Sequence, residues 1–300
     1  MDAATREALC AAAVKAARAV NYVGAGTIEF IADASEGLRA DRIWFMEMNT
    51  RLQVEHPVTE EITGVDLVEW QLRVASGEAL PLKQEELSIS GWAMEARLYA
   101  EDPAKGFLPS VGKLERFELG DIHLHGGRID TGVEEDGVVS PYYDPMIAKV
   151  IGHGQDRDQA RQLVHELVGQ TVVWPVRTNA AFLVKALEHP DFVAGNVDTG
   201  LIGRDGEGLA SPPVPSRVAL AFAAENLVSG NRQQGFRLNA PPRETAVFNV
   251  DGSRCDVVLQ CSEAEMTEAK FIHVTGSDTG SVLFSEQGQT WALSDRKSVV

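Results

Sequence analysis

Cysteine is scarce in this chain of 300 residues, which contains only Cys10, Cys255 and Cys261. Their spacing lacks the close pairs that are typical of zinc sites, and an odd number leaves one residue outside any set of disulfides. Scarce cysteines of this kind favour a reducing compartment.

Long hydrophobic runs are also lacking. The longest apolar stretch, residues 8–20, is interrupted by Lys15 and Arg18, so it cannot span a bilayer. The start of the chain has neither the basic residues nor the cleavage pattern of a secretory signal. We therefore expect a cytoplasmic protein that is not embedded in a membrane.

Positive charge is the third deficit. The chain has 27 Lys and Arg residues against 44 Asp and Glu residues, a formal net charge of −17. This balance argues against a nucleic-acid partner, because phosphate backbones are bound by clustered Lys and Arg, although a small anion needs only a local basic pocket. Hydrophobic residues make up 44% of the chain, enough for ordinary cores, and the length suggests two or three domains of roughly 100–150 residues.

Local patterns predict a protein with both helices and strands. Helices are expected at residues 3–20, 66–75, 158–168, 178–187 and 217–228. Strands are expected at residues 27–31, 43–48, 92–100, 111–117, 246–250, 256–260, 271–274, 281–284 and 290–293. The first two strands are predicted to pair as a hairpin, and residues 203–216, rich in Gly, Pro and Ser, are predicted to form a linker. The helix and short strands after it suggest a small antiparallel sheet or barrel.

The chemistry concentrates in residues 46–57, Met-Glu-Met-Asn-Thr-Arg-Leu-Gln-Val-Glu-His-Pro. If this segment is extended, alternate side chains lie on the same face. That face would carry five polar groups, from Glu47, Asn49, Arg51, Gln53 and Glu55.

Glu29 lies on the other strand of the predicted hairpin and could approach Glu47 or Asn49. Two carboxylates and an amide in an apolar surround repel and lose solvation unless a cation joins them. Hard oxygen ligands suit magnesium or manganese. Because magnesium usually completes its shell with water and substrate phosphates, the pattern implies a nucleotide.

Arg51, Gln53 and Glu55 combine a planar donor fork, an amide and a base. A guanidinium can hold a small oxyanion at two points, and a neighbouring carboxylate could accept its proton. The alternative is that Glu47, Arg51 and Glu55 form a solvated, salt-bridged strand face.

These residues resemble the biotin carboxylase family. Residues 47–60, Glu-Met-Asn-Thr-Arg-Leu-Gln-Val-Glu-His-Pro-Val-Thr-Glu, are similar to its ATP-grasp motif, and residues 24–30 to the strand before it. Four later segments resemble its C-terminal domain in the same order: residues 95–102, 107–110, 142–146 and 178–179. The resemblance covers about the first 200 residues. Residues 235–239 and the strands after them are similar, more weakly, to the middle region of acyl-CoA carboxylase α subunits, most like those acting on 3-methylcrotonyl-CoA and next those acting on propionyl-CoA.

The resemblance implies an α+β fold. Residues 1–82 would form the C-terminal part of an ATP-grasp domain, and residues 83–202 the biotin carboxylase C-terminal domain. Residues 203–216 would be the linker. Residues 217–300 would form a helix plus a small antiparallel β-barrel, incomplete here, that connects carboxylase to transferase.

The resemblance also implies a reaction in which ATP and bicarbonate carboxylate biotin through carboxyphosphate. At matching positions, Glu29 and Glu47 would bind ATP and, with Asn49, hold Mg²⁺ or Mn²⁺. Bicarbonate would be bound by Arg51, Gln53, the backbone of Val54, and Glu55. Arg51, Glu55 and Arg97 would be catalytic, with Glu55 as the general base and Arg97 holding the ureido oxygen of biotin.

Several parts of the family's pattern have no counterpart in these 300 residues. They are the N-terminal nucleotide-fold domain, the glycine-rich lid, the lysines that bind ATP and the Ala-Met-Lys-Met biotin site. We therefore expect a fragment that is inactive alone. Its expected partners are a biotin carrier domain, a carboxyltransferase β subunit and, in the intact enzyme, a second copy of the carboxylase part.

Two alternatives stay open. The large subunit of carbamoyl-phosphate synthase also activates bicarbonate on an ATP-grasp fold, but residues 91–199 argue against it. The other alternative is a non-catalytic assembly module that binds a carboxyltransferase through residues 210–300.

Overall fold

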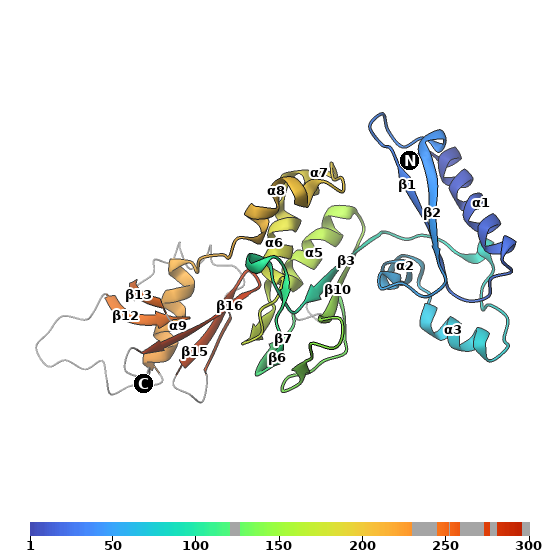
Figure 1. Cartoon of the computed structure of the whole chain (residues 1–300). Coiled ribbons are helices and arrows are strands. Elements are labelled where there is room, and N and C mark those ends of the chain that lie inside the picture. Colours follow the sequence, from blue (N-terminus) through green and yellow to red (C-terminus); the bar gives the residue numbers. More distant parts are fainter. Residues whose placement is uncertain (121–126, 230–244, 252, 259–272, 277–280, 296–300) are drawn as a thin grey trace, which may run out of the picture. The chain divides into compact units, whose positions relative to one another are not determined.

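The structure is a computed structural model that describes residues 1–120, 127–229, 245–251, 253–258, 273–276 and 281–295. The chain divides into two compact units, residues 1–91 and 92–300. Figure 1 follows the chain through both. The boundaries predicted after residues 82, 202 and 216 stay predictions.

The first unit combines helices with one hairpin (Figure 1). Its elements are α1 (Ala3–Ala19), β1 (Thr27–Ala32), η1 (Ala40–Arg42), β2 (Ile43–Asn49), α2 (His56–Thr63), α3 (Leu67–Ala75) and η2 (Gln84–Glu86). The carboxylate of Asp2 accepts the Thr5 amide at 2.7 Å and caps α1, and Asp66 caps α3 in the same way. Both predicted helices are thereby confirmed. Helix α2 was not predicted.

Strands β1 and β2 pair antiparallel, as predicted. Glu29 lies directly opposite Glu47, whereas Phe30 pairs with Phe45, so Met46 is an extra residue in β2. Such a bulge bends the strand and re-aims the side chains beside it. Glu29 and Glu47 therefore emerge on the same face of the hairpin, next to the irregularity.

The second unit begins with a three-stranded antiparallel sheet in the order β3-β10-β8. Its elements up to residue 210 are β3 (Trp92–Tyr99), β4 (Glu101–Asp102), η3 (Pro103–Lys105), β5 (Leu108–Pro109), β6 (Gly112–Lys113), β7 (Arg116–Glu118), β8 (Arg128–Thr131), β9 (Val138–Val139), β10 (Met146–Gly154), α5 (Arg157–Gly169), β11 (Val172–Trp174), α6 (Ala180–Glu188), α7 (Pro190–Ala194) and α8 (Leu201–Ala210). Three two-stranded ladders complete it: β4 with β5, β6 with β9, and β7 with β11. The single strand predicted for residues 111–117 is therefore two short strands, β6 and β7.

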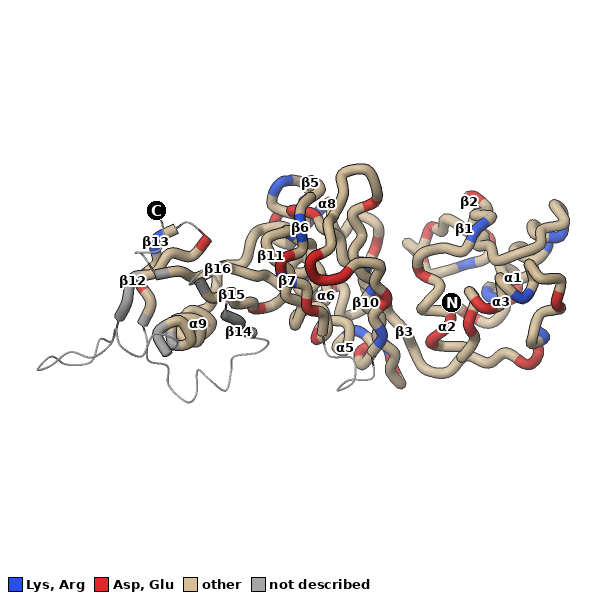
Figure 2. Tube along the Cα trace, turned by 90° about the horizontal axis from the view of Figure 1, so that it is seen from below, with Lys and Arg blue, Asp and Glu red and all other residues tan. Residues whose placement is uncertain are grey.

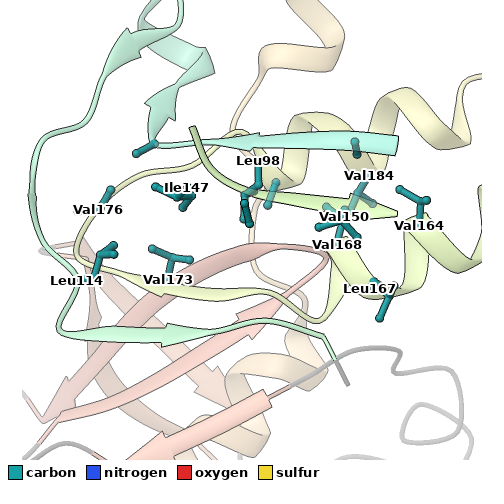
Figure 3. Close-up of a cluster of buried hydrophobic side chains, with 14 of the residues drawn as sticks. Leu98, Leu114, Ile147, Val150, Val164, Leu167, Val168, Val173, Val176 and Val184 are labelled. Atoms are coloured by element: carbon teal, nitrogen blue, oxygen red, sulfur yellow. The ribbon is translucent and has the colours of Figure 1, made fainter. Parts of the chain in front are cut away.

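The core of this region lies between the sheet and helices α5 and α6. Figure 3 shows Leu98 and Val150 from the sheet beside Val164, Val168 and Val184 from the helices. All five are at most 1% exposed. The spacing of valines 164 and 168 puts them on one helix face, which explains why α5 packs on the sheet.

The last part of the chain is an open sheet covered by a helix. Its elements are α9 (Arg217–Ser229), β12 (Thr245–Val250), β13 (Ser253–Val258), β14 (His273–Gly276), β15 (Ser281–Glu286) and β16 (Gln289–Asp295). The five antiparallel strands run in the order β13-β12-β16-β15-β14. Small residues of α9, such as Ala219 and Ala223, pack against Phe248 and Phe284.

The predicted barrel is wrong in the part of the chain that is described, because β13 and β14 are the two edges of this sheet and do not pair with each other. The α+β class itself is confirmed. The motif at residues 235–239 lies outside the described residues, as do parts of the strands predicted at 256–260 and 271–274.

The prediction of an irregular linker from residue 203 is wrong up to Ala210, because α8 occupies residues 201–210. The glycines of this segment suggested a break. Leu201 and Leu209, both 7% exposed, nevertheless supply an apolar helix face that buries against the unit. Within the predicted linker, residues 203–216, only residues 211–216 lie outside helices and strands.

Acidic and basic positions are interspersed along the described chain (Figure 2). Among the helices of the described residues, none is both long enough and apolar enough to cross a membrane.

Candidate functional site

The hairpin carries a cluster of two carboxylates and two amides. Asn49 donates from Nδ2 to Oε1 of Glu29 at 2.7 Å and to Oε1 of Glu47 at 3.2 Å. Gln53 donates from Nε2 to the same Glu29 oxygen at 2.7 Å. The structure therefore brings together four of the residues predicted for the site, with Asn49 linking the two carboxylates.

The path of the chain after Asn49 differs from the prediction of one extended face. Strand β2 ends at Asn49, residues 50–55 form a turn, and α2 begins at His56. Pro57 favours this start because its fixed φ suits the first helical turn, where no backbone donor is needed. His56 is the first residue of the helix, and its Nδ1 lies 2.8 Å from the Gln53 carbonyl oxygen.

Arg51 and Glu55 lie on this turn and are both exposed. The guanidinium of Arg51 donates to the Leu52 carbonyl oxygen at 3.3 Å. Glu55 occupies the N-cap position of α2, where its carbonyl accepts the Val58 amide at 3.1 Å, and Val54 precedes it. Glu55 therefore stands at an accessible helix start, where the backbone dipole favours a bound anion, and Arg51 lies four residues before it on the same turn.

The donor set of the cluster fits a hard divalent cation. Both carboxylates turn an oxygen to the Asn49 amide, so their charges converge on one point. A cation at that point would relieve the repulsion that the amide now only screens, and carboxylate oxygens are preferred ligands of Mg²⁺. Asn49 presents its NH₂ to them, and it would have to turn its oxygen inward to become a ligand itself.

Gly26 is a residue of this site that the prediction missed. A Cβ at this position would lie 3.1 Å from the carbonyl oxygen of Asn49 and 2.9 Å from the ring of Tyr22. The Tyr22 hydroxyl donates to the Ala25 carbonyl at 2.7 Å, which holds the ring in place. Two glycines just before an apolar strand, at 24 and 26, were the available signal for such a close backbone approach.

Arg97, the residue predicted to hold biotin, lies on the second unit, on the face of the β3-β10-β8 sheet opposite the core. In the strand register, Arg97 of β3 lies opposite Lys149 of β10, and Lys149 lies opposite Asp130 of β8. Arg97 Nε is 3.9 Å from Oε1 of Glu95, and its side chain is 41% exposed. A row of three charged residues, two basic and one acidic, therefore crosses the sheet from Arg97.

Lys149 and Asp130 were also missed, although a lysine inside the apolar strand 146–151 was a usable signal. Lys149 Nζ lies 3.2 Å from Asp130, which also accepts two hydrogen bonds from Arg128 at 2.8 and 2.9 Å. Burial alone would raise the pKa of the Asp130 carboxyl, but these hydrogen bonds outweigh it and hold the pKa below its usual value. Asp130 is therefore ionised at neutral pH, and its negative charge lies next to Lys149 in the row.

Asn179 at the start of α6 holds the backbone of β3 on both sides of Leu98. Its Oδ1 accepts the Tyr99 amide at 2.9 Å, and its Nδ2 donates to the Arg97 carbonyl at 3.2 Å. Its own amide donates to the Tyr99 carbonyl at 3.1 Å. With 6% of its surface exposed, Asn179 replaces water for three backbone groups next to Arg97.

We expect Asn179→Ala to lower the free energy of unfolding by about 1–3 kcal/mol, because it leaves buried backbone groups without their partners. Urea unfolding followed by circular dichroism measures this. The matched control is Asn226→Ala, which removes an exposed asparagine whose side chain donates to the Phe222 carbonyl within α9, and it should change stability by no more than about 0.5 kcal/mol. Equal effects of the two variants would contradict the role of Asn179.

Two family models match this chain, one on each unit. Residues 1–83 match the carbamoyl-phosphate synthase L chain ATP binding domain, and residues 95–204 match the biotin carboxylase C-terminal domain. The chain therefore combines an ATP-binding domain that carries clustered carboxylates with a biotin carboxylase C-terminal domain. The chain belongs to the biotin carboxylase family.

The relatives are consistent with this family. The chain is 44% identical over 254 residues to the methylcrotonoyl-CoA carboxylase subunit alpha of Dictyostelium discoideum. The matched region covers 79% of this chain and 36% of the relative. The chain is 46% identical over 200 residues to biotin carboxylase 1 of Bacillus subtilis, covering 66% and 43%. The chain therefore spans less than half the length of these relatives.

A solved structure shares the fold. It is the biotin carboxylase domain of Hydrogenobacter thermophilus 2-oxoglutarate carboxylase, a dimer in complex with MgADP and bicarbonate. It is 37% identical, with a TM-score of 0.65, and covers 71% of this chain and 46% of that one. The match over residues 95–204 favours the biotin carboxylase interpretation over carbamoyl-phosphate synthase.

Proposed function

We propose that this chain supplies part of the site at which ATP and bicarbonate carboxylate biotin, within an acyl-CoA carboxylase acting on 3-methylcrotonyl-CoA or propionyl-CoA. The observation that carries the proposal is the shared oxygen of Glu29, which accepts from both Asn49 and Gln53 at 2.7 Å. This oxygen joins the residues assigned to the metal with those assigned to bicarbonate. The two groups of residues therefore act at adjacent points.

Glu29, Glu47 and Asn49 would hold Mg²⁺ or Mn²⁺ with ATP, which supplies the phosphoryl group that activates bicarbonate. Arg51, Gln53 and the backbone of Val54 would hold the bicarbonate anion beside it. The Glu55 carboxylate would accept the proton from the bicarbonate hydroxyl, leaving an oxyanion that attacks the γ-phosphorus of ATP and displaces ADP to give carboxyphosphate. Placing these groups together converts an encounter of separate molecules into a reaction within one complex.

Arg97 would hold the ureido oxygen of biotin. A guanidinium stabilises the negative charge that grows on this oxygen as the ring nitrogen loses its proton to the phosphate released when carboxyphosphate breaks down to carbon dioxide. The nitrogen then attacks that carbon dioxide. Biotin would arrive on a carrier domain, and the proposed partners are that domain, a carboxyltransferase β subunit and a second carboxylase copy. We propose a cytoplasmic location.

The experiment is an exchange of segments. The 200 matching residues of Bacillus subtilis biotin carboxylase 1 are replaced by those of this chain, and ATP cleavage is measured with bicarbonate and free biotin. We expect activity within about tenfold of the parent enzyme, equivalent to about 1.4 kcal/mol.

The control is the same chimera carrying Arg97→Met, which keeps the aliphatic stem and removes the charge. It should retain bicarbonate-dependent ATP cleavage but lose the stimulation by biotin. A folded chimera without biotin-dependent activity would overturn the proposal. Strong cleavage that biotin does not stimulate would point instead to a ligase of the carbamoyl-phosphate synthase type.

A further inference from the structure

The turn between β15 and β16 inserts between α5 and α6 of the carboxylase C-terminal domain. The Gly288 amide donates to the carbonyl oxygen of Gly169, the last residue of α5, at 3.0 Å. Two residues further, Thr290 Oγ1 accepts the Val173 amide at 3.3 Å. An ion pair of 3.0 Å between Arg177 and Asp251 closes the same boundary.

Gly288 fits this position because it has no side chain. Its φ is +76°, a left-handed conformation that other residues rarely adopt. A Cβ here would lie 2.9 Å from Cβ of Ala180 and 3.0 Å from its carbonyl carbon, closer than such atoms approach. Ala180 is fully buried at the start of α6, so it cannot move aside. Both the turn and the contact therefore require glycine.

The residues between α8 and α9 are attached at both ends. Lys185 of α6 donates from Nζ to the carbonyl of Ser211 at 2.6 Å and to its hydroxyl at 2.9 Å. At the other end, the Ser216 amide donates to Glu286 of β15 at 2.8 Å. A connection held in this way does not act as a hinge.

We infer that the β15–β16 turn is a latch that fastens the C-terminal sheet to the carboxylase C-terminal domain, so that the two regions move as one body. Gly288 is the residue on which the latch depends. A protein bound to the sheet would then keep a constant position relative to Arg97. Separate movement about residues 211–216 would require breaking the contacts of Gly288, Thr290 and Arg177 together.

Hydrogen exchange of the 300-residue chain tests the latch, because the amides of Gly288 and Val173 donate across the boundary. In the unaltered chain we expect both to exchange far more slowly than in an unfolded peptide. Gly288→Ala should speed both by about tenfold or more while leaving the core amide of Val150 unchanged. The matched control is Gly195→Ala, which has the same φ of +76° but, among the described residues other than its two chain neighbours, no atom within 4 Å of the added Cβ. That variant should leave both amides protected.

A second variant covers the case in which Gly288→Ala unfolds the core as well. Thr290→Val keeps the shape of the side chain but removes the acceptor of the Val173 amide, so it should speed exchange at Val173 and not at Val150. Exchange of Gly288 and Val173 at unfolded rates in the unaltered chain would overturn the inference. So would unchanged exchange at Val173 in both variants.

Discussion

Glu55→Gln is expected to lower bicarbonate-dependent ATP cleavage by about 10²–10⁴-fold in the chimeric carboxylase, the loss typical of a general base. Glutamine keeps the size of the side chain and much of its hydrogen bonding but cannot accept a proton. Glu55 is exposed at the start of α2, so the substitution leaves the packing of the helix intact. The rate at saturating MgATP and bicarbonate, with free biotin, measures the effect.

The matched control for this variant is Glu85→Gln, an exposed glutamate of the same unit that lies in η2. It should change the barrier by no more than about 0.5 kcal/mol. Binding of MgATP should be nearly unchanged in both variants. If Glu55 belonged only to a solvated, salt-bridged surface, Glu55→Gln would turn over at a near-normal rate, and the assignment of the base would be wrong.

Glu47→Gln is expected to raise the magnesium concentration required for half-maximal activity by at least about 10–100-fold, a loss seen even when outer partners of a metal site are removed. Glutamine keeps an oxygen ligand but removes one of the two charges that converge on the Asn49 amide. Glu47 suits this test better than Glu29. It is exposed and makes one long hydrogen bond of 3.2 Å, whereas Glu29 also orders Gln53.

A magnesium titration of ATP cleavage measures this change. High magnesium should recover most of the rate in Glu47→Gln but none of the loss in Glu55→Gln, because only the first variant weakens metal binding. An unchanged magnesium dependence would remove Glu47 from the metal site. Glu85→Gln again serves as the control for a lost surface charge.

Whether a helix was predicted correctly depended on whether neighbouring residues or distant contacts stabilise it. Helices with a carboxylate cap and regular apolar spacing, such as those that start after Asp2 and Asp66, formed where they were predicted. Helix α2 was not predicted because it is short and polar residues separate its apolar residues Val58 and Ile62. Helix α8 was not predicted because its glycines disfavour a helix. It forms because burial of Leu201 and Leu209 offsets that cost.

The types of residue at the site were determined by the sequence alone. Carboxylates at 29 and 47 on two pairing strands, with an amide at 49, required only strand alternation and hairpin geometry. Tertiary structure decided how they meet. The bulge at Met46 sets Glu29 opposite Glu47, and the turn after Asn49 carries Gln53 back to Glu29, 24 residues away in the chain. Local sequence patterns could not predict the contact of Gly288 with Ala180. The two residues are more than 100 positions apart, and only the tertiary structure shows that a side chain at position 288 has no room.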